Sequence, residues 1–123
     1  MRKLVCLFLS LFSLNMVQAS PSELKLDLLP DLLKSPQLVV IDVYADWCGP
    51  CRRFEPIFQQ VSEQFSQQCA FFKLNGDLER ELVQHFHVTA YPTRIYLKEG
   101  KEISRSVGCV SMSELVSELK SLQ

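Results

Sequence analysis

The sequence predicts an α/β fold, a central mixed β-sheet flanked by helices, with the elements in the order β-α-β-α-β-α-β-β-α. Three observations lead to it. Residues 38–44 form a nearly continuous apolar run rich in β-branched side chains, typical of a strand covered on both faces. A helical pattern follows closely, over positions 54–65. Further strand-like runs lie at 69–74, 93–97 and 102–107, with helical patterns between and after them.

Two cysteines stand where the buried strand meets this helix, in the order Cys48-Gly49-Pro50-Cys51. A helix N-terminus offers unpaired N–H groups and the positive end of the helix dipole, so a thiol there should lose its proton readily. Pro50 has no N–H group and suits the first helical turn. We expect Cys48, at the exposed end, to be the attacking thiolate, and Cys51, turned inward, to be the resolving thiol.

A static disulfide or half of a zinc site would use the same residues. A four-thiolate zinc site usually needs a second closely spaced pair of cysteines. The remaining cysteines of the predicted domain, Cys69 and Cys109, are 40 residues apart. Redox chemistry is therefore the favoured interpretation, and no metal is expected.

The shorter elements are predicted from local patterns. The alternation Leu24-Lys25-Leu26 suggests a short edge strand, and residues 30–34 suggest one or two turns of helix. Asn75-Gly76-Asp77 should turn the chain and cap the next helix. The apolar face of that helix is expected to comprise Leu78, Leu82, Val83 and Phe86.

The C-terminal part of the sequence predicts a hairpin and a helix. Residues 98–101 read as the hairpin turn. Ser111 and Glu114 have the spacing of a capping box, which marks the start of a helix. The apolar face of that helix carries Leu115, Leu119 and Leu122.

The first 19 residues read as a secretory signal peptide. Arg2 and Lys3 precede an apolar stretch at 4–14, and Val17-Gln18-Ala19 provides a cleavage site before Ser20. An uncleaved membrane anchor is the alternative, but the stretch is short for a bilayer span. We therefore expect a mature domain of residues 20–123.

Composition fits one domain of ordinary size, with 47% hydrophobic and 22% charged residues and a net charge of −1. Cleavage would remove two of the 13 basic and none of the 14 acidic residues, which leaves a net charge of −3. With no polybasic run, nucleic acid is not an expected partner. Outside the cytosol, disulfides are chemically allowed.

The motif Trp47-Cys48-Gly49-Pro50-Cys51, with Asp42 six residues before Cys48, Pro56 in the helix and Tyr91-Pro92-Thr93 before a strand, resembles the thioredoxin family. The resemblance covers residues 20–123 and implies the thioredoxin fold. It implies that Pro92 is cis and lies beside the cysteines, where its backbone pairs with a substrate chain.

The resemblance also assigns catalytic support to Asp42 and Lys73. A buried carboxylate with a raised pKa is a workable base for the resolving thiol, and Asp42 matches that carboxylate. Lys73 matches a lysine on the neighbouring strand. Asp42 could instead form a local hydrogen bond, and Lys73 could be a solvated residue.

The expected substrate-binding surface comprises Trp47, Gly49, Pro50, Tyr91, Pro92, Gly108 and Cys109. Tyr91 departs from the family pattern: reducing thioredoxins commonly have Ile there and disulfide isomerases often Thr. In the family, this residue influences the redox poise, so the sequence does not decide whether the protein acts as a reductase, an isomerase or an oxidase.

Cys109 is the second departure. It could gate activity through a mixed disulfide, fill space as a small apolar residue, or pair with Cys69, although Cys69 is expected to be an inert core thiol. His85 and His87 are expected to be solvated residues at a helix end.

These features predict a periplasmic thiol–disulfide oxidoreductase that reduces or isomerises disulfides in exported proteins. It should act as a monomer without a cofactor, supplied with electrons by a membrane-embedded thiol relay. The C-terminal Lys120-Ser121-Leu122-Gln123 is not an ER-retention signal, which favours a bacterial envelope. A dithiol oxidase of the same fold and a redox-silent binding module are the alternatives, and the intact cysteine pair argues against the second.

Overall fold

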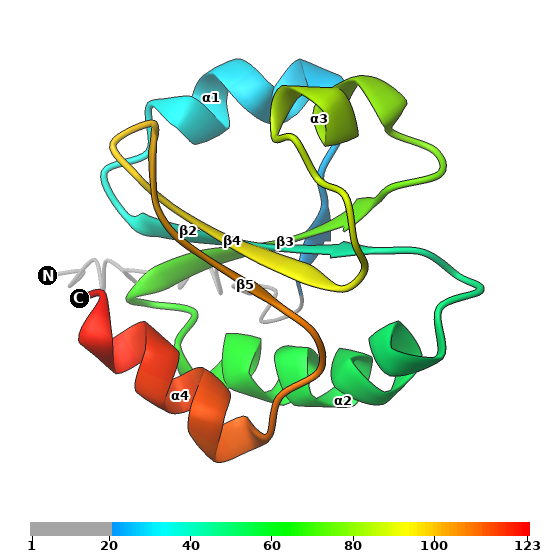
Figure 1. The fold of residues 1–123 in the computed structure, drawn as a ribbon. Coiled ribbons are helices and arrows are strands. Elements are labelled where there is room, and N and C mark those ends of the chain that lie inside the picture. The colour runs from blue at the N-terminus through cyan, green and yellow to red at the C-terminus, as the bar shows by residue number, and fades with distance from the viewer. Residues whose placement is uncertain (1–20) are drawn as a thin grey trace, which may run out of the picture.

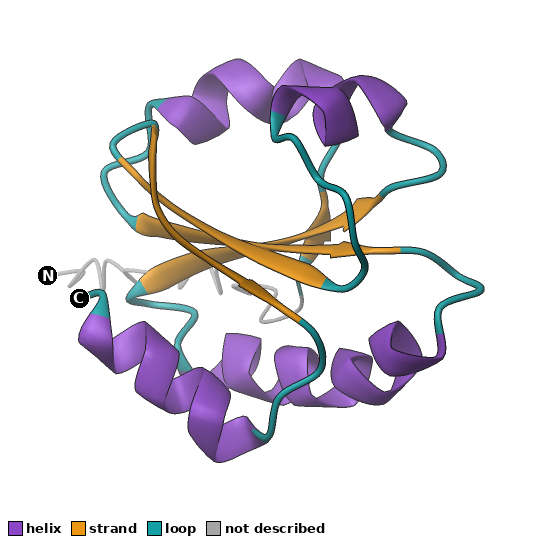
Figure 2. Cartoon of the chain, viewed as in Figure 1, coloured by secondary structure: helices purple, strands orange, loops and turns teal. Residues whose placement is uncertain are grey.

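A computed structural model describes residues 21–123 as one mixed sheet covered by helices on both faces (Figure 1). Five strands lie in the spatial order β1-β3-β2-β4-β5. Helices α1 and α3 cover one face, and α2 and α4 cover the other (Figure 2). The predicted signal peptide, residues 1–19, lies outside the described residues.

The order of the elements along the chain is the predicted one, with a short 3-10 helix added before α1. The elements are β1 (Ser22–Glu23), η1 (Leu26–Leu28), α1 (Leu29–Leu33), β2 (Leu38–Tyr44), α2 (Gly49–Gln64), β3 (Cys69–Asn75), α3 (Arg80–His85), β4 (Thr93–Lys98), β5 (Lys101–Val107) and α4 (Met112–Ser121).

Strand β2 is the centre of the sheet, and its burial explains its apolar sequence. It pairs in parallel with β3 and antiparallel with β4. Because side chains alternate along a strand, Val39, Ile41 and Val43 enter the core beneath α1 and α3. Val40 enters the second core beneath α2 and α4. Asp42 falls on this second face by the same alternation.

The edge strand differs from the prediction. It spans Ser22–Glu23 rather than Leu24–Leu26. Leu24 is fully buried and its N–H donates to the Lys73 carbonyl at 2.7 Å, which ends the pairing with β3. The chain then turns, since the Leu28 N–H donates to the Lys25 carbonyl. Leu26 therefore lies in the 3-10 helix and is exposed.

Helix α3 begins later than the sequence predicts. Its first residue is Arg80, and its N-cap, Glu79, makes no side-chain capping bond. Asn75 Oδ1 instead accepts the N–H groups of Asp77 and Leu78 and so closes a turn before the helix. Leu78 is exposed as a result, whereas Leu82 is buried in the core as predicted.

Helix α4 starts with the predicted capping box. The Glu114 N–H donates to Ser111 Oγ at 3.2 Å, and the Ser111 N–H donates to Glu114 Oε2 at 2.8 Å. Leu115 and Leu119 are fully buried between α4 and the sheet.

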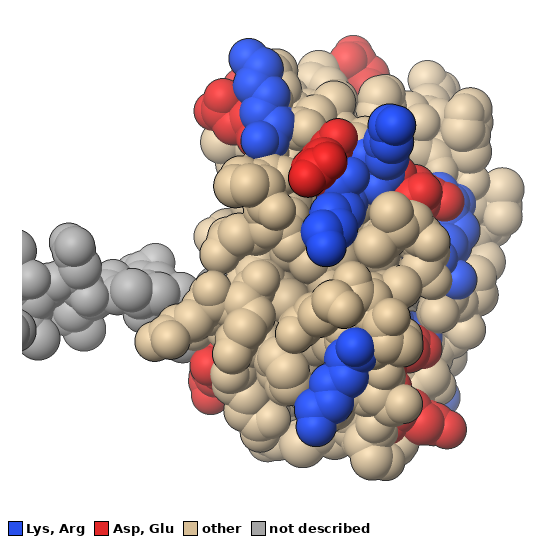
Figure 3. Space-filling view, turned by 90° about the vertical axis from the view of Figure 1, so that its left-hand side faces the viewer, with Lys and Arg blue, Asp and Glu red and all other residues tan. Residues whose placement is uncertain are grey.

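The face seen in Figure 3 lies away from the junction of β2 and α2. Basic and acidic side chains alternate on it without a broad area of either sign. Over residues 21–123, no helix is both long and apolar enough to span a membrane.

Candidate active site

The Cys48–Cys51 disulfide lies at the junction of β2 and α2. Cys48 is the N-cap of α2, and the Cys51 N–H donates to Cys48 Sγ at 3.2 Å. Pro50 occupies the first helical turn. The same N–H and the helix dipole would stabilise a thiolate on Cys48 after reduction. The helix therefore favours Cys48 as the attacking thiolate.

The expected difference in exposure between the two cysteines is absent in this oxidised state. Cys48 is 5% exposed and Cys51 is 4% exposed. The bond ties the sulfur of Cys48 to the inner cysteine, and both pack against Ala45, Tyr44 and Tyr91. The position of Cys48 at the N-cap, rather than its exposure, distinguishes the two sulfurs.

The segment before β4 contains a cis-proline, and the residue before that proline, Tyr91, packs against the disulfide cluster. The Tyr91–Pro92 peptide bond is cis, as the resemblance implies. Tyr91 packs edge-on against Trp47, with ring centroids 5.9 Å apart, and touches the cysteine cluster. Trp47 is 67% exposed, which suits it to contact a substrate.

Two residues that sequence reasoning missed hold these aromatic rings. Trp47 Nε1 donates to Asp77 Oδ2 at 2.9 Å. Gly76 lies under the Tyr91 hydroxyl, where an added Cβ would come within 2.2 Å of that oxygen. The sequence marks Gly76 and Asp77 only as a turn, because their partners come from other segments of the chain.

The loop after β5 lies next to the cis-proline. The Gly108 N–H donates to the Pro92 carbonyl at 2.9 Å, and the Gly108 carbonyl accepts from Arg94 Nη1. The φ of Gly108 is 97°, which favours glycine. Cys109 follows it as an exposed free thiol, while Cys69 is a buried free thiol. The two are not bonded to each other, and burial raises the pKa of Cys69.

Asp42 lies buried beneath α2. It is 1% exposed, and its Oδ1 has no hydrogen-bond partner among residues 21–123. Burial raises its pKa to about 7, which outweighs the lowering effects of Lys73 and Arg94. Asp42 and Cys51 line one cavity of about 350 Å³, together with Tyr44, Asp46, Glu55 and Lys73. A carboxyl that titrates near neutral pH therefore shares a cavity with the inner cysteine.

Lys73 is the direct neighbour of Asp42 on β3, as the resemblance implies. Its Nζ, however, forms its ion pair with Glu55 Oε1 at 3.0 Å. The ammonium group also lies 4.3 Å from the centroid of the Tyr44 ring. Within the described residues Lys73 therefore acts on Asp42 through its field rather than through an ion pair.

The sequence model of the family described as Thioredoxin matches residues 25–121. The chain belongs to the thioredoxin family. Thioredoxin from Neurospora crassa is 42% identical over 76 residues, which cover 60% of this chain and 60% of that protein. Thioredoxin-2 from Saccharomyces cerevisiae is 42% identical over 77 residues, which cover 63% of this chain and 73% of the yeast protein.

A solved structure shows the same fold. The crystal structure of thioredoxin from Malassezia sympodialis has a TM-score of 0.77 and 28% sequence identity, covering 83% of this chain and 90% of that one. The match to the Neurospora protein spans about three fifths of its length.

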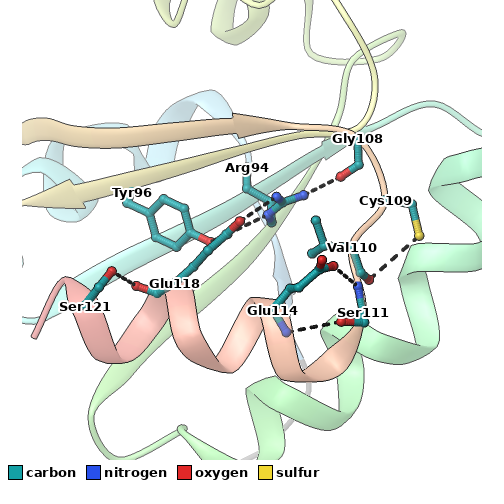
Figure 4. A network of polar contacts seen from close by, with 9 residues as sticks. All are labelled: Arg94, Tyr96, Gly108, Cys109, Val110, Ser111, Glu114, Glu118 and Ser121. Atoms are coloured by element: carbon teal, nitrogen blue, oxygen red, sulfur yellow. Dashed lines mark hydrogen bonds and ion pairs between the residues drawn. The ribbon is translucent and has the colours of Figure 1, made fainter.

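This thioredoxin-family chain also contains a buried arginine that the sequence reasoning missed. Arg94 Nε and Nη2 each donate to one oxygen of Glu118 at 3.0 Å (Figure 4). The Tyr96 hydroxyl donates to the same carboxylate. The pKa of Glu118 is lowered by these bonds, although burial opposes them. The one sequence signal for this network is a charged residue within an otherwise apolar strand.

Residues 21–123 contain no group of three or more His, Cys, Asp or Glu side chains placed to hold a metal ion. His85 packs edge-on against Phe86 at the end of α3. His87 follows with a φ of 52°.

Proposed function

We propose that the protein is a thiol–disulfide oxidoreductase that reduces or isomerises disulfides in exported proteins. The observation that carries this proposal is the Cys48–Cys51 disulfide at the N-terminus of α2. Tyr91, which precedes the cis-proline Pro92, packs against it, and Asp42 shares a cavity with Cys51. Membership of the thioredoxin family supports the same chemistry.

In the first step, the Cys48 thiolate attacks one sulfur of a substrate disulfide. A bond forms between Cys48 Sγ and that sulfur while the substrate S–S bond breaks. The other substrate sulfur leaves as a thiolate and takes a proton from water. The Cys51 N–H and the dipole of α2 stabilise the Cys48 thiolate before the attack.

In the second step, Cys51 resolves the mixed disulfide. Its thiol gives a proton to the Asp42 carboxylate, and its sulfur attacks Cys48 Sγ. The Cys48–Cys51 bond forms, and the second substrate sulfur leaves as a thiolate. The substrate has then gained two electrons, which the protein dithiol has lost. A pKa of about 7 suits Asp42 to accept this proton near neutral pH.

The proposed substrate surface surrounds the disulfide. Trp47 supplies exposed aromatic area next to the half-buried Tyr91, and Pro92, Gly108 and Cys109 form the adjoining backbone and loop. Gly49 and Pro50 complete the surface within the first turn of α2. A protein disulfide in an extended chain is the substrate class that such a surface fits.

The compartment and the electron donor are part of the proposal. The pattern of residues 1–19 supports export, and a bacterial periplasm is the proposed location. Electrons would then come from a membrane-embedded thiol relay acting on the Cys48–Cys51 disulfide. N-terminal sequencing of the protein after expression in a bacterial host tests the export, with Ser20 as the expected first residue.

Reduction of insulin disulfides, with dithiothreitol as the electron source, tests the activity. The wild type should accelerate precipitation of the insulin B chain, and Cys48→Ser should not. Equal rates with both proteins, or no activity in either, would contradict the proposal and favour a binding module. The reduction potential of the pair then separates a reductase, near about −270 mV, from an oxidase, near about −120 mV.

A further inference from the structure

A row of three charged residues crosses the sheet beneath α2. Asp42 on β2 is paired in register with Lys73 on β3 and with Arg94 on β4. Residues paired in this way point their side chains to the same face of the sheet. The Asp42 carboxyl is therefore flanked by two cations, and both lower its pKa.

Each of the two cations is ion-paired with a glutamate that comes from a helix. Lys73 Nζ lies 3.0 Å from Glu55 Oε1 on α2. Arg94 binds both oxygens of Glu118 on α4, at 3.0 Å each. Its third nitrogen, Nη1, donates to the Gly108 carbonyl, so every nitrogen of the guanidinium has a partner away from Asp42 (Figure 4).

Among residues 21–123, Asp42 itself is left without an ion pair. Its Oδ1 has no hydrogen-bond partner within residues 21–123, although the side chain is fully enclosed. An opposite charge close to a carboxyl ordinarily holds it in the ionised form. Here burial prevails, and the negative charges of Glu55 and Glu23 add to its effect on the pKa of Asp42.

We propose that Glu55 and Glu118 are positioning residues for Asp42: by keeping Lys73 and Arg94 in ion pairs of their own, they leave the Asp42 carboxyl free to take the Cys51 proton. This inference rests on the proposed function, in which Asp42 is the proton acceptor. The other charged or titratable groups around the carboxyl are Glu23, Tyr44, Asp46, Arg52 and Cys51. The two glutamates act through the cations rather than on the substrate.

Glu55→Gln tests the inference most directly. Glu55 has an exposed side chain, so the variant should fold. Without its carboxylate, Lys73 can turn to Asp42, and the midpoint of the Asp42 titration should fall by about one pH unit. The measurement is the NMR chemical shift of the Asp42 carboxyl carbon against pH, on the oxidised protein. Glu63→Gln is the matched control on α2, since the Glu63 carboxylate accepts a hydrogen bond from the Gln59 amide rather than pairing with a cation next to Asp42. In this variant the midpoint of the Asp42 titration should equal that of the wild type.

Glu118→Gln tests the other side of the row. It should also lower the midpoint, because Arg94 loses its carboxylate partner. Tyr96→Phe is its control, since it removes a bond to Glu118 but leaves the Arg94–Glu118 ion pair. If Glu118→Gln does not fold, Glu55→Gln alone decides the result.

The rate of mixed-disulfide resolution against pH provides the second measurement. In Glu55→Gln its acid limb should move to lower pH together with the Asp42 midpoint. A midpoint unchanged from the wild type in Glu55→Gln would overturn the inference. Because the titration is measured on the resting disulfide, it does not depend on turnover. A shifted midpoint in a protein that reduces no disulfide would refute the proposed function while supporting the role of the ion pairs.

Discussion

At the scale of single residues, the burial of Asp42 and its proposed role as a base place opposite demands on its protonation state. A carboxyl can be fully enclosed at little energetic expense only while it is protonated, but a base must be able to lose that proton. A pKa of about 7 lets Asp42 do both, because it is neutral in mild acid and ionised in mild base. Within residues 21–123 the Asp42 Oδ1 has no hydrogen-bond partner, as the proposed role of a proton acceptor requires of a carboxyl that must stay free to titrate.

Asp42→Asn removes the proposed proton acceptor and keeps the shape of the side chain. Resolution of the mixed disulfide should slow by about 10²-fold or more at pH 8, as expected for the loss of a general base. The rise of the wild-type rate around pH 7 should disappear. Stopped-flow measurement of substrate release, after attack by Cys48, gives this rate. Unchanged resolution between pH 6 and 8 would leave Asp42 with a structural role alone.

The two remaining thiols should differ strongly in reactivity. Cys109 is exposed, whereas Cys69 is buried and has a pKa raised by its burial. Since the thiolate is the reactive form, iodoacetamide at pH 8 should label Cys109 in the oxidised native protein and leave Cys69 unmodified. Peptide mass spectrometry identifies the labelled residue. Cys109→Ala should show no label until the protein is denatured.

At the scale of elements, local patterns predicted most of the fold. Strand β2 was predicted from its nearly continuous apolar run, and helix α2 from the helical spacing of its apolar residues. Both patterns lie within a single stretch of the sequence. The start of α3 was wrong because Asn75 accepts the N–H groups of a turn instead of those of the helix. The edge strand was misplaced because its position depends on pairing with β3, which no local pattern encodes.

The residues of the candidate site also divide into those that the sequence predicted and those that it did not. The cysteine pair was found from its local motif, and Asp42 and the cis-proline were assigned through the resemblance to the thioredoxin family. Arg94 and Glu118 are 24 positions apart on different elements, and neither residue alone indicates an ion pair. The bond of Trp47 to Asp77 spans 30 positions and was missed for the same reason.

The capping box of α4 gives a prediction at this scale. Ser111→Ala removes the acceptor of the Glu114 N–H at the start of the helix. The free energy of unfolding should fall by about 1 kcal/mol. Urea denaturation followed by circular dichroism measures the change. Ser121→Ala, at the other end of the helix, should change stability less, since the Ser121 hydroxyl bonds a carbonyl within its own helix.

At the scale of the whole molecule, the sheet couples the redox site to both helices on one of its faces. The row Lys73-Asp42-Arg94 runs across three strands, and its outer members are tied to α2 and α4. Arg94 also binds the Gly108 carbonyl, while the Gly108 N–H binds Pro92. The charge balance around Asp42 and the position of the loop at Gly108 therefore depend on the same buried arginine.

This arrangement predicts two opposite effects of pH on stability. The pKa of Asp42 is 3.8 in a model compound and about 7 in the folded protein, so the folded state holds a proton that the unfolded state releases between these values. The contribution of Asp42 to folding stability should therefore fall by about 4 kcal/mol as pH rises from about 4 to 7. Asp42→Asn should be free of this loss, so its advantage over the wild type should grow across that range.

Glu118 should act in the other direction and at lower pH. Its pKa is lowered in the folded state, so its ionised form stabilises the protein above the ordinary value of 4.5, and this contribution is lost as pH falls through the folded pKa. Glu118→Gln should be less stable than the wild type at pH 7, and the difference should shrink in acid. Urea denaturation of the oxidised proteins at pH 3, 5 and 7.5 measures both trends, with Glu63→Gln as the control. Parallel stability curves for the wild type and Asp42→Asn would mean that Asp42 is not protonated in the folded protein at pH 5, and the proton acceptor would have to be sought elsewhere.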